Sequence, residues 1–170
     1  PAATWRDGAI LGALALVSYV TQAYGLQYIS SNRSAFLTSL NVLMVPLLGL
    51  LWGGTLSALT LACALAACLG IGLMSWEGGA HLLGDGATLL CALAYALYVI
   101  VLSQRAAEHD ARQLTATQIL FMTVFAGLWV VASDASSGTL HSLNQRLLPH
   151  LWPLVYLGLI ATAGMLLLQA

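Results

Sequence analysis

The stretch GATLLCALAYALYVIVLS, residues 86–103, decides the fold class of this chain. It contains 18 residues and no charged side chain. An α-helix rises about 1.5 Å per residue and the hydrocarbon core of a bilayer is about 30 Å thick, so about 20 mostly apolar residues are enough to cross it. With the three residues just before it, which include Asp85, this stretch predicts a membrane-spanning helix over residues 83–103.

Five further segments share this apolar character. None of them alternates polar and apolar residues with a period of two, as the strands of a membrane barrel do. Backbone groups in lipid must therefore be satisfied within each segment, which only a helix achieves. The sequence predicts an all-α, polytopic transmembrane bundle of about six helices, the other five over residues 9–28, 35–52, 56–76, 114–132 and 151–170.

Composition supports this class and excludes others. The chain has 170 residues, of which 60% are hydrophobic and 6% are charged, and its mean hydropathy is +0.89. Soluble domains carry about 25% charged residues, so this chain could not cover a water-facing surface. A net charge of −1 excludes a broad basic footprint for nucleic acid. The lipid bilayer is the expected partner, and the expected location is the plasma (inner) membrane, in multiple passes.

The charged residues fall mainly in the predicted connections. If the N-terminus is cytoplasmic, Arg6, Arg105 and Arg112 lie inside, with Arg33 and Arg146 outside. Three arginines inside against two outside weakly favour this orientation under the positive-inside rule. The chain begins at proline and ends within an apolar run, so we expect it to be the middle of a longer protein.

The spacing of the cysteines and histidines does not indicate a metal site, a cofactor site or a disulfide bond. The three cysteines include no C-x-x-C pair, and the four histidines include no H-x-x-x-H or H-E-x-x-H pair. We therefore expect no metal site and no cofactor.

Three motifs resemble those of a transporter family. They are GLQYISSNRSAFLTSLNVLMVPLL at residues 25–48, GDGATLLCALAYALY at 84–98 and YLGLIATA at 156–163. Their order and spacing are similar to EamA-type transporters of the drug/metabolite transporter superfamily. That family often carries a glutamate at the end of its fourth helix. Here the corresponding residues are Trp52-Gly53-Gly54, so no role of that glutamate carries over.

The resemblance implies a ten-helix fold built from two inverted repeats of five helices. The six predicted helices would then be the third to the eighth. Residues 1–79 would hold the last three helices of the first repeat, and residues 80–170 the first three of the second. The similar strings LGALA at 11–15 and LGLIA at 157–161 fit this inverted repeat, because an offset of five helices reverses the second copy in the bilayer.

Neutral polar side chains recur on one face of four predicted helices. Such groups are costly in lipid and usually face the bundle interior. The resemblance implies a central cavity lined by the third, fourth, sixth and eighth helices, which are these four. Helix–helix hydrogen bonds are the alternative role. The substrate-binding candidates are Gln22, Thr38, Asn41, Tyr95, Tyr98 and Thr162.

Small residues and a proline predict further features of the helices. Gly8 and Gly12 form a G-x-x-x-G pair, and residues 62, 66 and 70 form a similar small-residue stripe. Both patterns predict close helix packing. Pro46 lacks a backbone N–H, which frees the carbonyl of Val42 and predicts a kink there.

The sequence thus predicts a secondary transporter rather than an enzyme, moving a small metabolite, amino acid or drug-like solute by alternating access, with efflux as the expected direction. A membrane-embedded enzyme and a non-transporting scaffold are the alternatives, and a homodimer stays open. No carboxylate lies in the centre of these predicted helices, which favours facilitated exchange or export, or a coupling residue in the helices that lie outside this stretch.

Overall fold

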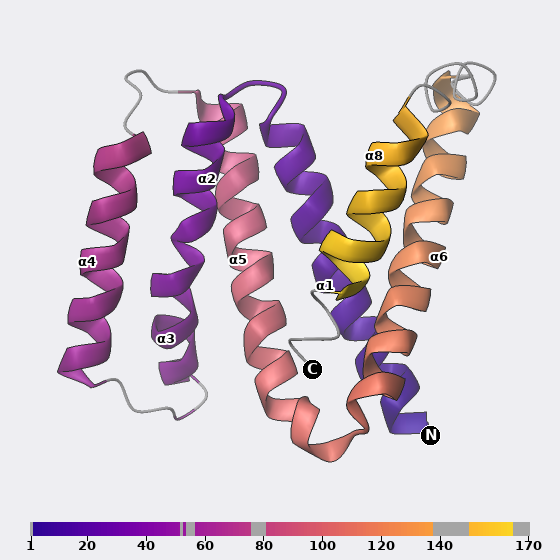
Figure 1. The fold of residues 1–170 in the computed structure, drawn as a ribbon, viewed down its shortest axis with the longest axis horizontal. Helices are drawn as coiled ribbons and strands as arrows, with labels where there is room; N and C mark the ends of the chain where they lie inside the picture. The colour runs from indigo at the N-terminus through magenta and orange to yellow at the C-terminus, as the bar shows by residue number, and fades with distance from the viewer. Residues whose placement is uncertain (1, 52, 54–56, 76–80, 138–149, 165–170) are drawn as a thin grey trace. The chain divides into compact units, whose positions relative to one another are not determined.

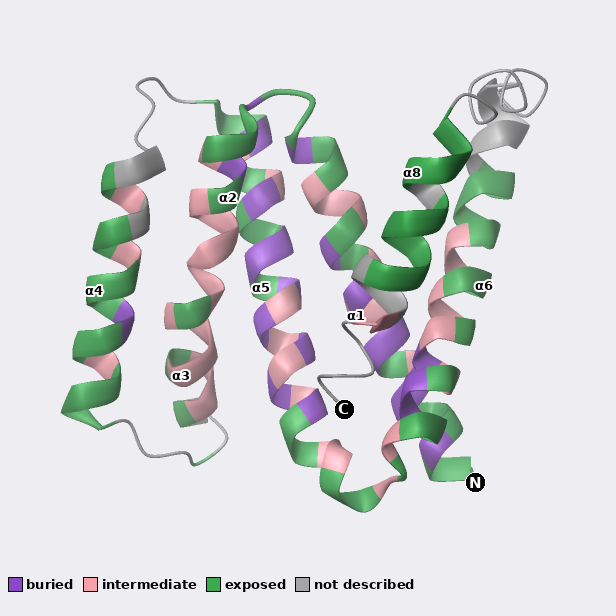
Figure 2. Ribbon diagram, in the orientation of Figure 1, coloured by how far each residue is buried: buried purple, intermediate pink, exposed green. Residues whose placement is uncertain are grey.

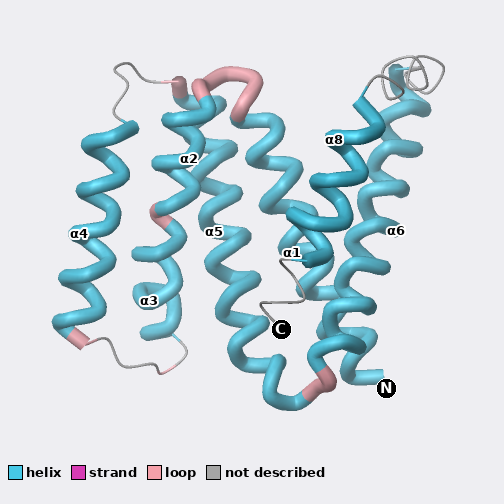
Figure 3. Tube along the Cα trace, viewed as in Figure 1, coloured by secondary structure: helices cyan, strands magenta, loops and turns pink. Residues whose placement is uncertain are grey.

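A computed structural model describes residues 2–51, 53, 57–75, 81–137 and 150–164. These residues form helices and connections, without a strand (Figure 1, Figure 3). The all-α prediction is therefore confirmed. The elements are α1 (Ala2–Gly25), α2 (Ser31–Ser39), α3 (Asn41–Leu51), α4 (Ala58–Ser75), α5 (Leu82–Arg105), the short 3₁₀-helix η1 (Ala106–Glu108), α6 (Ala111–Ser137), α8 (Leu151–Tyr156) and the π-helical segment η3 (Leu157–Gly164).

Four stretches of helix are long and apolar enough to cross a membrane, judged by length and composition. Two further apolar stretches, Ala58–Gly70 and Leu151–Ile160, are shorter. Each of the six predicted segments contains helix in the described part of the structure, although residues 26–28 and 40 form turns. The four long stretches are Ala2–Gly25, Ser31–Leu50, Leu82–Glu108 and Ala111–Ala132.

The chain divides into two compact units, and each is described by itself. The central unit contains residues 14–104, and the flanking unit contains residues 1–13 and 105–170. The boundaries fall inside α1 and at the end of α5.

In the central unit, α5 carries the main buried face. Its buried residues run from Gly84 to Leu102 and include the polar side chains of Thr88, Cys91 and Tyr98. Figure 2 shows this buried face along α5. The start of α5 lies against the end of α1, since a Cβ atom on Gly84 would be 3.3 Å from the Gly25 carbonyl oxygen. Glycine at both positions allows this close approach.

The α4 helix packs against α2 and α3, but not through the predicted small-residue stripe. Ala62 and Ala66 are exposed, and a Cβ on Gly70 would have no atom within 4 Å. The packed face instead includes Ala64, which is buried, and Gly72, whose Cβ would lie 3.1 Å from the Phe36 ring. Each residue of the predicted stripe lies two positions from a residue of the packed face, which is a rotation of about 200° around the helix axis. The predicted stripe therefore faces away from this contact.

The predicted helix over residues 35–52 is interrupted at Leu40, which separates α2 from α3. Ser39 Oγ donates to the Phe36 carbonyl at 2.6 Å, and the Leu40 N–H bonds to the Leu37 carbonyl at 3.3 Å. A serine that bonds back to its own helix competes with the regular backbone pattern. The interruption thus falls two residues before the predicted kink at Val42, while Pro46 lies inside α3.

In the flanking unit, the first residues of α1 pack closely against α6. A Cβ on Gly12 would lie 2.7 Å from the Gln118 carbonyl oxygen and 3.0 Å from the Met122 nitrogen. Trp5 meets Phe121 edge to face with ring centroids 6.0 Å apart. The predicted packing role of the G-x-x-x-G pair is therefore confirmed.

The prediction that charges stay in the connections is wrong for several residues. The helices extend beyond the apolar segments, and α1 begins at Ala2 rather than at residue 9. These extra turns are held by caps and ion pairs that hydropathy does not register. The charged residues outside the predicted segments that lie inside α-helices are Arg6 and Asp7 in α1, Arg33 in α2, Arg105 in α5, and Arg112 and Asp134 in α6.

Candidate functional site

Two of the six predicted binding residues contact each other in the central unit. Gln22 Nε2 in α1 donates to Thr38 Oγ1 in α2 at 3.4 Å, and both side chains are half-buried. This hydrogen bond is long, so its contribution to the stability of the helix pair is smaller than the average of about 0.6 kcal/mol for interhelical hydrogen bonds in membranes. A half-buried amide and hydroxyl at this junction retain hydrogen-bonding capacity for another partner.

Two other predicted residues form an aromatic pair on α5. The rings of Tyr95 and Tyr98 stack with centroids 5.8 Å apart. Tyr98 is 1% exposed, whereas Tyr95 is half-buried. One turn earlier, Cys91 Sγ lies 3.3 Å from Ser18 Oγ of α1. The polar face of α5 is therefore packed against the polar face of α1.

The remaining two predicted residues are not brought into these contacts. Asn41 is half-buried and is the first residue of α3, directly after the interruption at Leu40. Thr162 lies in η3, but its side chain is outside the described part of the structure. Neither of the two described pockets is lined by any of the six predicted residues.

An ion pair joins α2 to α5 at a position that the sequence did not indicate. Arg33 donates from Nε and Nη2 to the two carboxylate oxygens of Asp85, at 2.6 Å and 2.7 Å. The side chains are only 16% and 19% exposed. Asp85 also accepts the N–H of His81, the residue before α5, at 3.1 Å. A carboxylate in the first turn of a helix also interacts favourably with the helix dipole.

A second group of charges, which we call the Asp7 cluster, lies in the flanking unit. His109 Nε2 lies 2.9 Å from Asp7 Oδ2, and His109 Nδ1 lies 3.2 Å from Thr4 Oγ1. Asp7 is 1% exposed and the His109 side chain 7%. Arg6 donates to Asp7 at 3.0 Å. The cluster consists of Thr4, Arg6, Asp7, Arg105, Glu108 and His109.

The ligand atoms of Asp7, Glu108 and His109 lie within 4.8 Å of one another, a spacing that a metal ion could use. Arg105 Nη1, however, lies 3.9 Å from Asp7 and 3.5 Å from Glu108. A guanidinium so close to both carboxylates offsets part of their negative charge and would repel a cation.

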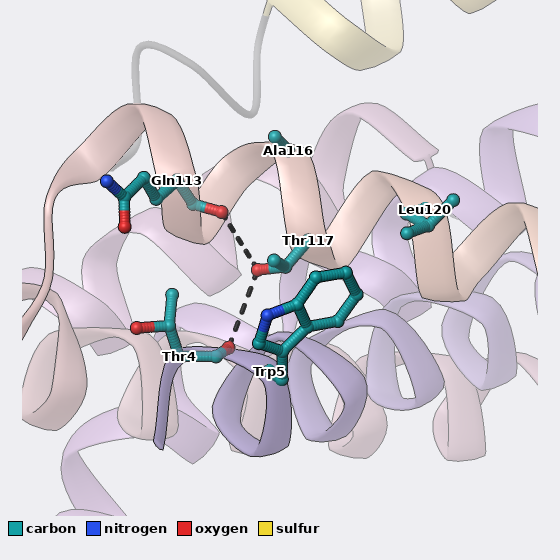
Figure 4. A pocket seen from close by; sticks show the side chains of 6 residues that line it. All are labelled: Thr4, Trp5, Gln113, Ala116, Thr117 and Leu120. Atoms are coloured by element: carbon teal, nitrogen blue, oxygen red, sulfur yellow. Dashed lines mark hydrogen bonds between the residues drawn. The ribbon is translucent and has the colours of Figure 1, made fainter. Parts of the chain in front are cut away.

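A pocket of about 380 Å³ opens beside this cluster. In Figure 4 the Trp5 indole forms one wall, and Thr117 connects α6 to the Thr4 carbonyl oxygen. Thr117 Oγ1 lies 2.9 Å from the Gln113 carbonyl. The complete lining is Thr4, Trp5, Gln113, Ala116, Thr117 and Leu120.

Sequence reasoning missed both ionic groups because the partners are far apart in the chain. Arg33 and Asp85 are separated by 52 positions, and Asp7 and His109 by 102. One signal was available: Asp85 stands in a G-D-G string directly before an apolar run, where a first-turn acid is favoured. For Asp7 and His109 the sequence contains no comparable signal.

These helices define an integral, multi-pass, α-helical membrane protein. Residues 1–76 match the EamA-like transporter family. The chain is also 26% identical over 123 residues to an uncharacterized transporter of Archaeoglobus fulgidus, an alignment that covers 72% of this chain and 38% of the relative. The chain thus spans well under half the length of this curated relative. No solved structure matches the chain.

Proposed function

We propose that this chain is part of a secondary transporter that moves a small solute across the membrane by alternating access. The match of residues 1–76 to the EamA-like transporter family carries the proposal. The name of the Archaeoglobus fulgidus relative agrees with it. On this proposal the protein is not an enzyme and works in the plasma (inner) membrane, with efflux as the direction of transport.

The proposed architecture follows from the same resemblance. The six helical segments are the third to the eighth of ten, residues 1–79 belong to the first repeat, and residues 80–170 belong to the second. In transporters of this kind the two inverted halves rock about a site near the bilayer midplane. The family match ends at residue 76, close to the proposed junction of the repeats.

The proposed solute is neutral or zwitterionic and partly apolar. The candidate groups offer an amide, hydroxyls and phenol rings, and none of them carries a formal charge at neutral pH. Within the central unit, Gln22, Thr38 and Tyr95 are half-buried, so each retains some accessible surface. A few placed polar groups among apolar walls are typical of sites that orient small molecules.

The test is solute protection of introduced cysteines in the full-length protein reconstituted in proteoliposomes. Cys63, Cys68 and Cys91 are first replaced by serine, and cysteine is then placed at Gln22 or Tyr95. Uptake of labelled neutral amino acids and small amphipathic amines identifies a transported compound. We expect this compound to slow maleimide labelling at both positions several-fold, because an occupied site excludes the reagent.

Matched positions on the same helices provide the control. Val17 on α1 and Leu93 on α5 are 43% and 38% exposed, and cysteines there should label at the same rate with and without solute. Equal protection at control and test positions would show a general change in the protein rather than a binding site. Absence of uptake for every compound in the panel would count against transport itself.

A further inference from the structure

The ion pair between Arg33 and Asp85 lies where the two proposed repeats meet. We propose that this ion pair is a gate: it holds the solute path closed at one face of the membrane and breaks when that face opens. The role in transport rests on the proposed function, whereas closure of this end of the central unit does not. The pair sets how often the path opens and does not itself bind the solute.

The pair joins segments that the proposed mechanism moves apart. Arg33 is the third residue of α2, in residues 1–79, and Asp85 is the fourth residue of α5, in residues 80–170. In alternating access the two inverted halves rock against each other, so contacts between them at one face must break when that face opens. Both helices begin at the same end of the central unit (Figure 1). The orientation that the arginine count favours places this end at the outer face, where an exporter releases its solute.

The contact is strong enough to hold a closed state and exposed enough to reopen. Nε and Nη2 of Arg33 donate to the two carboxylate oxygens of Asp85, at 2.6 Å and 2.7 Å. Such bidentate, charge-assisted pairs are among the strongest hydrogen-bonded contacts in proteins. A fully buried pair would be very costly to separate, and a fully exposed one would hold little. The two side chains are 16% and 19% exposed and lie between these limits, so water can solvate both once they separate.

The end of the central unit beside the pair is closely packed. Thr88 lies one turn further along α5 than Asp85 and is 0% exposed. A Cβ on Gly84 would lie 2.7 Å from the Ile29 side chain and 3.3 Å from the Gly25 carbonyl oxygen. The start of α5 and the end of α1 thus leave no space between them here. A solute cannot pass through this packing, so the helices must separate before it leaves at this end.

A buried hydroxyl next to the ion pair favours a second arrangement of α2. Ser34 follows Arg33 and is 1% exposed, and its Oγ has no hydrogen-bond partner among the described residues. A buried polar group without a partner costs free energy. An arrangement of α2 that gives this hydroxyl a partner would regain that free energy and offset part of the cost of breaking the ion pair. The difference in free energy between the closed arrangement and an open one is reduced accordingly.

The first test measures whether loss of the pair opens this end. T88C is introduced into the full-length protein, with all native cysteines replaced by serine, and the protein is reconstituted in proteoliposomes. A maleimide that cannot cross the membrane is added from each side in turn. We expect little labelling while the ion pair is intact. In D85N the labelling rate from one side should rise at least fivefold, because this end no longer stays closed.

Thr115 provides the matched control for general loosening of the protein. It is 1% exposed, lies on α6 in the flanking unit and allows the same change from threonine to cysteine. Labelling of T115C should differ less than twofold between the proteins with and without D85N.

The second test links the pair to transport. R33C and D85C are combined and joined by a short bifunctional methanethiosulfonate. We expect uptake of the transported compound to fall at least tenfold on cross-linking and to return when a reductant cleaves the link. Recovery in the same sample excludes misfolding as the cause.

The control for this test is a cross-link within one proposed repeat. Ser57 Oγ and Thr60 Oγ1 lie 2.8 Å apart at the start of α4. Joining S57C to T60C does not tie the repeats together, so uptake should stay within twofold of the unlinked protein.

The outcomes separate the gate from the proposed function. Equal labelling of T88C with and without D85N would overturn the gate, and so would equal increases at T88C and T115C. If a compound is transported and the cross-link between R33C and D85C leaves its uptake unchanged, the pair is not a gate, although the transport proposal stands. If no compound is transported, the transport proposal fails, while selective labelling of T88C in D85N still supports closure of this end by the ion pair.

Discussion

Replacement of Asp85 by asparagine is expected to lower the free energy of unfolding by about 2–3 kcal/mol, slightly less than the loss of one partner from a fully buried ion pair. The variant removes the carboxylate charge that faces the Arg33 guanidinium, a side chain that is only 16% exposed. Two hydrogen bonds of 2.6 Å and 2.7 Å lose their ionised acceptor. The first turn of α5 also loses a favourable charge.

Chemical denaturation of the purified full-length protein in micelles would measure this loss. E108Q is the control, because Glu108 is 59% exposed and its 3.5 Å contact with Arg105 is worth less than about 1 kcal/mol. A double-mutant cycle with R33Q should show that the effects of the two substitutions are strongly non-additive. Equal losses in D85N and E108Q, or simple additivity in the cycle, would mean that the ion pair does not hold α2 to α5.

Replacement of Gly12 by alanine is expected to destabilise the flanking unit by about 2–3 kcal/mol, at the upper end of overpacking effects. The added Cβ would lie 2.7 Å from the Gln118 carbonyl oxygen and 3.0 Å from the Met122 nitrogen. Both atoms belong to the backbone of α6, which cannot rotate away as a side chain can. The two helices must therefore separate, and their packing contacts weaken together.

Gly127→Ala is the matched control on α6, where an added Cβ would have no atom within 4 Å. The same chemical change there should be neutral or should stabilise the helix by up to about 1 kcal/mol, because alanine restricts the unfolded chain. Thermal unfolding of both variants in the same detergent would measure the difference. A similar melting temperature for G12A and G127A would contradict the close packing of α1 on α6.

The helices could be predicted because each one is determined by its own stretch of sequence and not by distant contacts. Long apolar runs without charge, such as residues 86–103, have one stable conformation in lipid whatever their neighbours are. The packing role of Gly8 and Gly12 was predictable for a similar reason, since small residues four positions apart leave a groove on any helix. The side of α4 that packs was not predictable, because several of its faces carry small residues.

The candidate site was predictable only in part, because it depends on tertiary contacts. The buried positions Thr88, Cys91 and Tyr98 share a face by helical spacing. The contact between Gln22 and Thr38 joins two helices, so spacing within one helix does not predict it. The two ionic groups likewise depend on how distant segments meet, and most of their members lie outside the apolar segments.

The length of α1 makes bilayer thickness a further variable for the Asp7 cluster. A helix of 24 residues is about 36 Å long, about 6 Å more than an average hydrocarbon core. The excess equals roughly one turn, so Arg6 and Asp7, in the second turn, lie close to the boundary between the acyl chains and the lipid headgroups. Hydrophobic mismatch then changes the surroundings of these two charged side chains. In a thicker membrane they lie nearer to the acyl chains, and in a thinner one they lie in water.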